Sequence, residues 1–203
     1  MSVLRQASVR RSTALLLAAT LVISSSPEEA HLMTTGLGTI YDEISHFLIS
    51  PEDLVPAFVL ALLAGQNGPE AGRKVLFILP ASWLAGGLWG LAFRSPPLPD
   101  LTWVSFILLG GLVAAKLRLL PSVIGALALV LGLLHGFLNG ATMGIASAGL
   151  GALFGIAATV FVVESLVAAT VVAFTWQPAR IAFRVLGSWT AATGILLLGW
   201  SLR

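Results

Sequence analysis

The chain has no cysteine and little charge. None of its 203 residues is Cys, and only 10% are Asp, Glu, Lys or Arg. Without cysteine, disulfides, iron–sulfur clusters and thiolate-bound metal sites are excluded. A soluble domain carries about 25% charged residues, so an ordinary soluble protein is excluded as well. The basic residues stand in ones and twos and do not cluster with aromatics, and we therefore expect no nucleic-acid partner.

Long apolar runs take the place of charge. Hydrophobic residues make up 57% of the chain, with Leu, Ala, Gly and Val dominating the runs. About 20 such residues cross a bilayer as a helix, whereas a transmembrane barrel would show alternating segments of about 10 residues. The sequence therefore predicts an all-α polytopic membrane protein with six transmembrane helices. We place these helices at about 52–66, 75–93, 101–116, 119–138, 150–174 and 179–201.

The first residues predict a secretory signal peptide. Three arginines precede an apolar core at 13–23, which is short for a membrane span. An uncleaved anchor is the alternative, and it leaves the rest of the topology unchanged. We predict a signal peptide at 1–30 and a membrane domain at 31–203. His31 could then lie at a mature N-terminus, where an amine and an imidazole can bind metal together.

The basic residues predict the orientation of the spans. Six fall on one side of the predicted membrane and two on the other, a bias expected for a cytoplasmic side. The six are Arg73, Lys74, Lys116, Arg118, Arg180 and Arg184. Most acids fall on the opposite side. We therefore expect a bacterial inner-membrane location, with the acidic loops facing the periplasm.

The stretch "YDEISHFLISPEDLVPAF", at 41–58, combines a helix start with candidate metal ligands. Ser50 precedes Pro51 and two acids, which predicts an N-cap and a capping box between Ser50 and Asp53. In that interpretation Glu52 and Asp53 need no ligand; the alternative is that both bind metal.

Asp42 and His46 lie four residues apart, so a helix places them on one face. An imidazole beside carboxylates is a good site for a divalent metal. A solvated interfacial helix with ordinary charges is the alternative.

Three further polar residues lie in apolar runs. His135 and Asn139 are again four residues apart, near the predicted outer end of the fourth span, and Glu164 is the only acid well inside a span. Intramembrane ionisable groups commonly mark an ion path. The alternatives are a histidine bonded to a carbonyl, and a carboxyl that is neutral or paired with another helix. Frequent glycines predict close helix packing, and their excess at 136–151 predicts a broken helix or re-entrant turn.

The segments "GLGTIYDEISHFLISPEDLVPAFVLALLAGQNG", "LPASWLAGGLWG" and "LLHGFLNGA" together resemble the HupE/UreJ family, in its second branch. The resemblance implies nickel or cobalt permeation across the inner membrane, linked to hydrogenase and urease maturation and hence to maturation proteins as partners. One family motif is a histidine, five residues, then Asp-His. His46 matches its first histidine, whereas Glu52 and Asp53 stand where the Asp-His pair would be.

The second family motif begins with His-Gly, has an alanine two residues later, and closes with Gly-Glu. His135, Gly136 and Gly140 match it. Leu138 replaces the alanine and Ala141 the closing glutamate. One histidine is thus traded for a carboxylate and one carboxylate is lost, which makes the implied ligand set richer in oxygen.

Together these features predict a permease for a divalent transition metal. The expected metal ligands are Asp42, His46, Glu52, Asp53, His135 and Asn139, with Glu164 on an intramembrane ion path. No cofactor is expected to be permanently bound. Because the sequence contains no GxxxxGK[ST] loop, we expect the chain to have no ATPase of its own. The alternatives are an accessory protein that binds metal without transporting it, and a permease for another small solute. The sequence shows no nucleophile–base pair that would indicate an enzyme.

Overall fold

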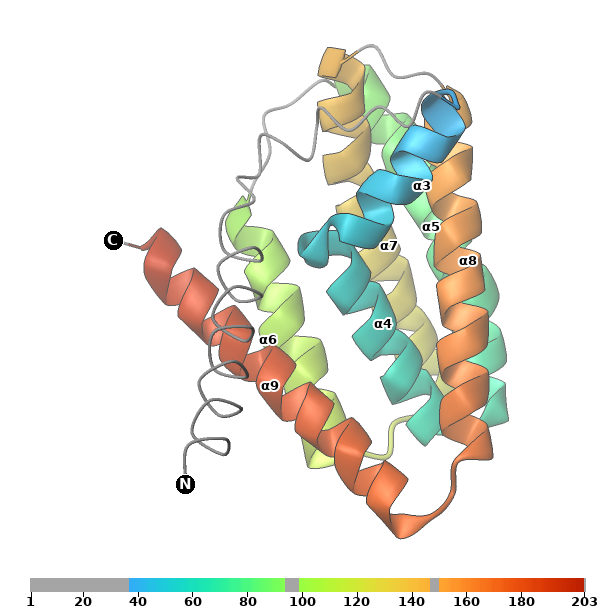
Figure 1. Cartoon of the computed structure of the whole chain (residues 1–203), viewed down its shortest axis with the longest axis vertical. Helices are drawn as coiled ribbons and strands as arrows, with labels where there is room; N and C mark the ends of the chain where they lie inside the picture. Colours follow the sequence, from blue (N-terminus) through green and yellow to red (C-terminus); the bar gives the residue numbers. More distant parts are fainter. Residues whose placement is uncertain (1–36, 94–98, 147–149, 203) are drawn as a thin grey trace, which may run out of the picture. The chain divides into compact units, whose positions relative to one another are not determined.

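The computed structural model describes residues 37–93, 99–146 and 150–202. These residues form seven α-helices and no strand (Figure 1). The helices are α3 (Thr39–Ile49), α4 (Pro51–Gln66), α5 (Pro69–Phe93), α6 (Pro99–Ala115), α7 (Pro121–Ala146), α8 (Leu150–Ala173) and α9 (Gln177–Ser201). The predicted signal peptide at 1–30 and His31 lie outside the described residues.

Proline marks where several of these helices begin. Pro51, Pro69, Pro99 and Pro121 are the first residues of α4 to α7. Proline suits this position, because its fixed φ matches the helix and its missing N–H would have no helical partner there. Each predicted apolar run falls on one of α4 to α9, and their helical nature is confirmed.

The number of spans is matched only in part. By length and composition, α5, α7, α8 and α9 can each cross a membrane, and α3 with α4 would add a fifth span if the bent pair counts as one. In α6 the apolar helix Thr102–Ala115 is shorter than a typical span. The described part of the chain is therefore a multi-helix protein of the membrane type.

A sharp bend lies at Ser50, between α3 and α4. There α3 and α4 meet at 74°, and Ser50 itself is extended, with φ −90° and ψ 100°. The residue before a proline is disfavoured in the helical region, so Pro51 ends α3 and starts α4 in one step. The capping box predicted between Ser50 and Asp53 is wrong, since Ser50 makes no side-chain cap bond.

The break predicted at 136–151 is also wrong for the residues that can be described, because α7 continues without interruption to Ala146. His135 is therefore well inside α7 and not near its outer end. Residues 147–149 lie outside the described range. The glycines serve packing instead, as a small-residue seam between two helices.

That seam joins α5 and α7, which run in the same direction. An added Cβ on Gly136 would overlap the carbonyl oxygen of Trp83, and one on Gly140 would overlap that of Gly87. Gly86 and Gly90 make the reciprocal contacts with the α7 backbone. The predicted close helix packing is confirmed, and backbone lies against backbone along this pair.

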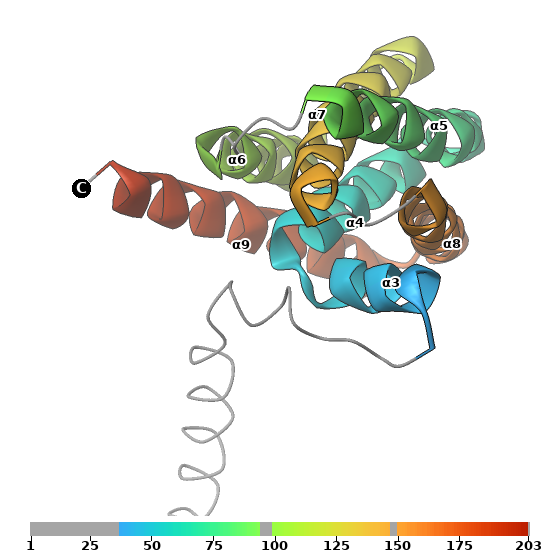
Figure 2. The ribbon, with the colours of Figure 1, turned by 90° about the horizontal axis from the view of Figure 1, so that it is seen from above.

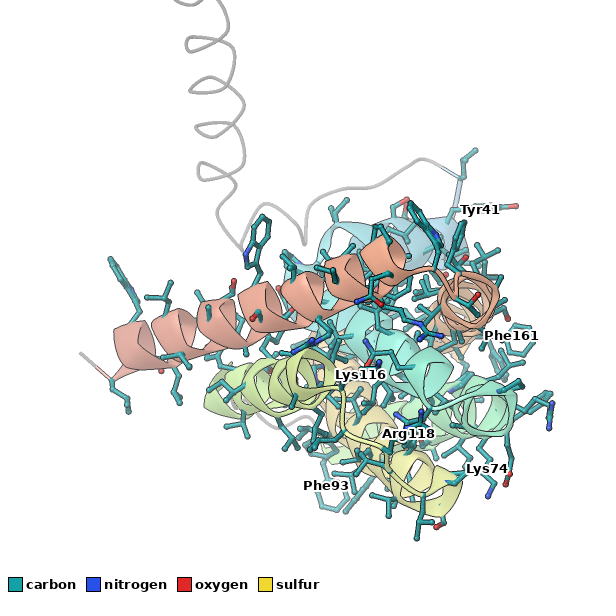
Figure 3. All side chains as sticks on the ribbon, turned by 90° about the horizontal axis from the view of Figure 1, so that it is seen from below. Tyr41, Lys74, Phe93, Lys116, Arg118 and Phe161 are labelled. Carbon is teal, nitrogen blue, oxygen red and sulfur yellow. The ribbon has the colours of Figure 1, made fainter. Side chains whose placement is uncertain are left out.

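The other helices pack on this pair and on one another. The helix α8 packs on α3, α4 and α5, while α9 packs mainly on α6 (Figure 2). At one end of the helices Asn67 Oδ1 accepts the N–H of Leu119 at 2.8 Å, and Arg184 Nε donates to the carbonyl of Ala114 at 2.9 Å. Figure 3 shows Lys74, Lys116 and Arg118 around this end. The loops predicted to share a side therefore do so.

Candidate functional site

A chain of three buried polar side chains links three helices. His135 on α7 places Nδ1 3.0 Å from Asp53 Oδ1 on α4. Its other ring nitrogen, Nε2, lies 3.3 Å from Ser105 Oγ on α6. His135 is 0% exposed, and Asp53 and Ser105 are also buried. A polar group in such a place is stable only with hydrogen-bonding partners, which these residues provide for one another.

The first turn of α4 positions Asp53. Two neighbouring acids follow Pro51, and they point in opposite directions: Glu52 is exposed and Asp53 is buried. Asp53 uses Oδ1 to bond to His135, and the Ser50 N–H that a capping box would engage donates instead to the His46 carbonyl at 2.9 Å. Ser50 Oγ lies 3.4 Å from both ring nitrogens of His46 and is likewise turned away from the α4 backbone.

The hydrogen bonds indicate which nitrogen of His135 carries a proton. An ionised carboxylate can only accept hydrogen bonds, so beside an ionised Asp53 the Nδ1 of His135 carries the proton and donates it in a hydrogen bond to Oδ1. Ser105 Oγ donates to the carbonyl of Thr102 at 2.6 Å, a shorter contact than its 3.3 Å approach to Nε2. The lone pair of Nε2 therefore has no strong donor. A histidine held in this way by a carboxylate is a typical metal ligand through its second nitrogen.

Aromatic rings form one wall of the site. The ring centroid of Trp83 lies 5.4 Å from that of His135, at an interplanar angle of 36°. Phe47 meets Trp83 edge-on at 5.6 Å. Both aromatic residues are fully buried, and the indole N–H of Trp83 has no hydrogen-bond partner. In this apolar setting the electrostatic interactions of Asp53 and His135 are stronger than in water.

The remaining predicted ligands lie at different distances from this site. Asn139 is one turn beyond His135 on α7, and its amide nitrogen donates to the His135 carbonyl at 2.9 Å. Asp42 and His46 are half-buried on α3. No three His, Asp or Glu side chains come close enough to hold a metal ion within the described ranges. The structure thus brings together Asp53 and His135, with Asn139 adjacent.

Sequence reasoning missed Ser105, Thr102, Trp83 and Phe47 as parts of the site. Ser105 and Thr102 lie in an apolar run with no motif around them. Trp83 packs inside the protein, and its contact with His135 has no sequence signal.

The order Asp53–His135–Ser105 is also the order that activates a serine in many hydrolases. Here the Ser105 hydroxyl donates to the Thr102 carbonyl, so its proton is not directed to His135. The serine is also buried inside a regular helix. This geometry favours an imidazole that binds a cation over an activated nucleophile.

Glu164 is a second buried polar group, on α8. It is 1% exposed, and neither of its carboxyl oxygens has a hydrogen-bond partner.

Comparison with known proteins gives one match. The family model described as HupE / UreJ protein matches residues 18–197, which is most of the chain. No curated protein and no solved structure matches.

Proposed function

Because the chain belongs to the HupE/UreJ family, we propose that it is an inner-membrane permease for a divalent transition-metal ion, with nickel or cobalt as the cargo. The family is associated with nickel and cobalt transport or with accessory roles in metallocentre assembly. Maturation proteins of such metalloenzymes are the expected partners on the cytoplasmic side, and the lipid bilayer surrounds the helices.

The observation that carries the proposal is the Asp53–His135 pair. A histidine with Nδ1 bonded to a carboxylate presents Nε2 to a metal ion, and here that histidine is buried within helices of the membrane type. Asp53 acts first by orienting the ring. The second Asp53 oxygen and Asn139, one turn along α7, are the further candidate ligands. Asp42, His46 and Glu52 lie on α3 and the start of α4, where they would attract the ion from the outer side.

The membrane potential suffices to drive entry. A charge crossing the membrane gains about 2.3 kcal/mol per 100 mV, so a dication gains about 4.6 kcal/mol. No nucleotide-driven step is needed for uptake of this kind, and we expect no enzymatic activity.

The test compares two neighbouring acids. Proteoliposomes containing the full chain are assayed for uptake of Ni²⁺ and Co²⁺, for the wild type, Asp53→Asn, His135→Ala and the control Glu52→Gln. Loss of a carboxylate that orients a metal-binding histidine typically lowers affinity 10–100-fold, so Asp53→Asn should raise the half-saturating concentration by that factor. Glu52→Gln should change uptake little, because Glu52 is exposed. Equal uptake by wild type, Asp53→Asn and His135→Ala would refute the assignment of Asp53 and His135 to the metal site.

A permease for another small solute is the second candidate. It is favoured by the lack of any three-residue group of His, Asp or Glu able to hold a metal in the described part of the chain. Binding of Ni²⁺ or Co²⁺ to the purified protein without flux into liposomes would instead favour an accessory protein. If the purified protein does not bind Ni²⁺ or Co²⁺ and does not pass either ion into liposomes, the permease for another solute is favoured.

A further inference from the structure

Glu164 lies on the buried side of α8. It lies four residues after Val160 and four before Ala168, all three buried on one side of α8. An added Cβ on Gly65 of α4 would lie 3.0 Å from the Ala168 carbonyl oxygen, and one on Gly72 of α5 would lie 3.7 Å from the Ala168 Cβ. Ala168 thus touches both helices. Glu164, one turn earlier, lies on the same buried side of α8.

No charged partner among the described residues reaches this carboxyl. The titratable side chains on the helices packed against α8 are Tyr41, Asp42, Glu43 and His46 on α3, Glu52 and Asp53 on α4, and Glu70, Arg73 and Lys74 on α5. None donates a hydrogen bond to Glu164. Of the two cations, Arg73 is exposed, and Lys74 pairs with Glu70 at 3.3 Å.

A carboxylate in this place needs a counter-charge. An ionised group removed from water without a partner is strongly unfavourable, and such a group neutralises or pairs. The described residues supply no partner, so the neutralising species comes from outside the protein. A proton meets this need when the site is empty, and a cation meets it when the site is loaded.

We propose that Glu164 is a proton–cation exchange site. With no cargo present, one carboxyl oxygen holds a proton. When a divalent cation arrives, the O–H bond breaks, the proton leaves to water, and the carboxylate pairs with the cation. Two positive charges enter and one leaves in each exchange. The identity of the cation rests on the proposed function, whereas the bound proton does not.

The position of Glu164 along α4 and α8 supports this role. These helices run in the same direction, and Gly65 packs on Val171, seven residues or about 10 Å beyond Glu164. Next to Gly65 is Gln66, whose side-chain oxygen is also buried without a partner. By the same register Asp53, twelve residues before Gly65, is level with Thr159, which is five residues or about 7.5 Å from Glu164 in the other direction. Glu164 is thus an intermediate acceptor between the Asp53–His135 pair and Gln66.

The test reads the proton directly. Infrared spectra of the full chain in lipid at neutral pH are recorded for the wild type, Glu164→Gln and the matched control Glu70→Gln, with and without Ni²⁺ or Co²⁺. Wild type and Glu70→Gln should show the carbonyl stretch of a protonated carboxylic acid, which saturating metal removes. Glu164→Gln should lack it. A pH-sensitive dye should record about one proton released per ion by the first two proteins, and at least tenfold less by Glu164→Gln.

Three results would overturn the proposal: no protonated band in the wild type, a band that metal does not change, or the same proton release from Glu164→Gln as from the wild type. Glu164→Asp keeps an ionisable carboxyl and should retain a band, which guards against misfolding of the glutamine variant. Metal uptake is measured on the same vesicles. If metal removes the band and releases protons but no metal enters, the exchange site stands and the permease function fails.

Discussion

The glycine seam between α5 and α7 allows a stability prediction with an internal control. Gly136→Ala adds one methyl group against the backbone of Trp83, overlapping its carbonyl oxygen and lying 2.8 Å from its carbonyl carbon and 2.9 Å from its Cα. Backbone atoms cannot rotate away as a side chain would. The two helices must therefore separate locally. Overpacking of this kind costs about 1–3 kcal/mol.

Gly111→Ala on α6 is the matched control, because a Cβ there meets nothing within 4 Å. Both variants gain about 0.5–1 kcal/mol from replacing a helical glycine with alanine. That gain cancels in the comparison, so the difference between them is the packing cost of about 1–3 kcal/mol. The corresponding change in the unfolding equilibrium is about 5- to 150-fold.

The assay is denaturant unfolding of the purified protein in detergent, followed by helical circular dichroism. Gly136→Ala should unfold at clearly lower denaturant than Gly111→Ala. It should also weaken metal binding, since the displaced Trp83 packs against His135. If the two variants unfold at the same denaturant concentration, the seam does not restrain these helices and the reasoning fails.

Two further predictions concern the aromatic wall of the site. Phe47→Ala should lower the free energy of unfolding by about 3–5 kcal/mol, because Phe47 is fully buried against Trp83. The neighbouring residue Leu48 is 47% exposed, so the control Leu48→Ala should change the free energy of unfolding by less than about 0.5 kcal/mol. Unfolding in detergent measures both, and similar losses would show that α3 is not held by Phe47. Binding of Ni²⁺ or Co²⁺ at His135 should quench tryptophan fluorescence mainly through Trp83, whose ring centroid lies 5.4 Å from that of the imidazole. Trp83→Phe should remove most of this quenching, whereas the control Trp189→Phe, at an exposed position, should not. Unchanged quenching in Trp83→Phe would place the ion elsewhere.

The helices were predictable because the apolar runs that form them are long and continuous. The start of α4 was predictable from Ser50-Pro51, although the same dipeptide gave no sign of the 74° bend. The break predicted within 136–151 is not found in the described residues, where α7 runs unbroken to Ala146. Glycine frequency alone does not distinguish close packing from helix breaking. Only the position of α5 shows that packing explains these glycines.

The site was predictable in its members more than in its geometry. Asp53 and His135 were both candidates, yet they are 82 residues apart, and no local pattern says that they bond. Glu52 was an equal candidate to Asp53, and the choice between them depends on the rotation of α4 about its axis. Ser105 had no signal, since a lone serine in an apolar run most often bonds to its own helix, as Ser105 also does through Thr102.

The seam between α5 and α7 has a consequence for motion. Backbone contacts this close leave no room for the two helices to slide, so they move as one rigid unit. Any opening that lets a solute pass must shift other helices relative to this unit. His135 belongs to the unit, whereas Asp53 is on α4. In the proposed permease, a displacement of α4 would therefore separate Asp53 from His135, so that opening and ligand affinity would change together.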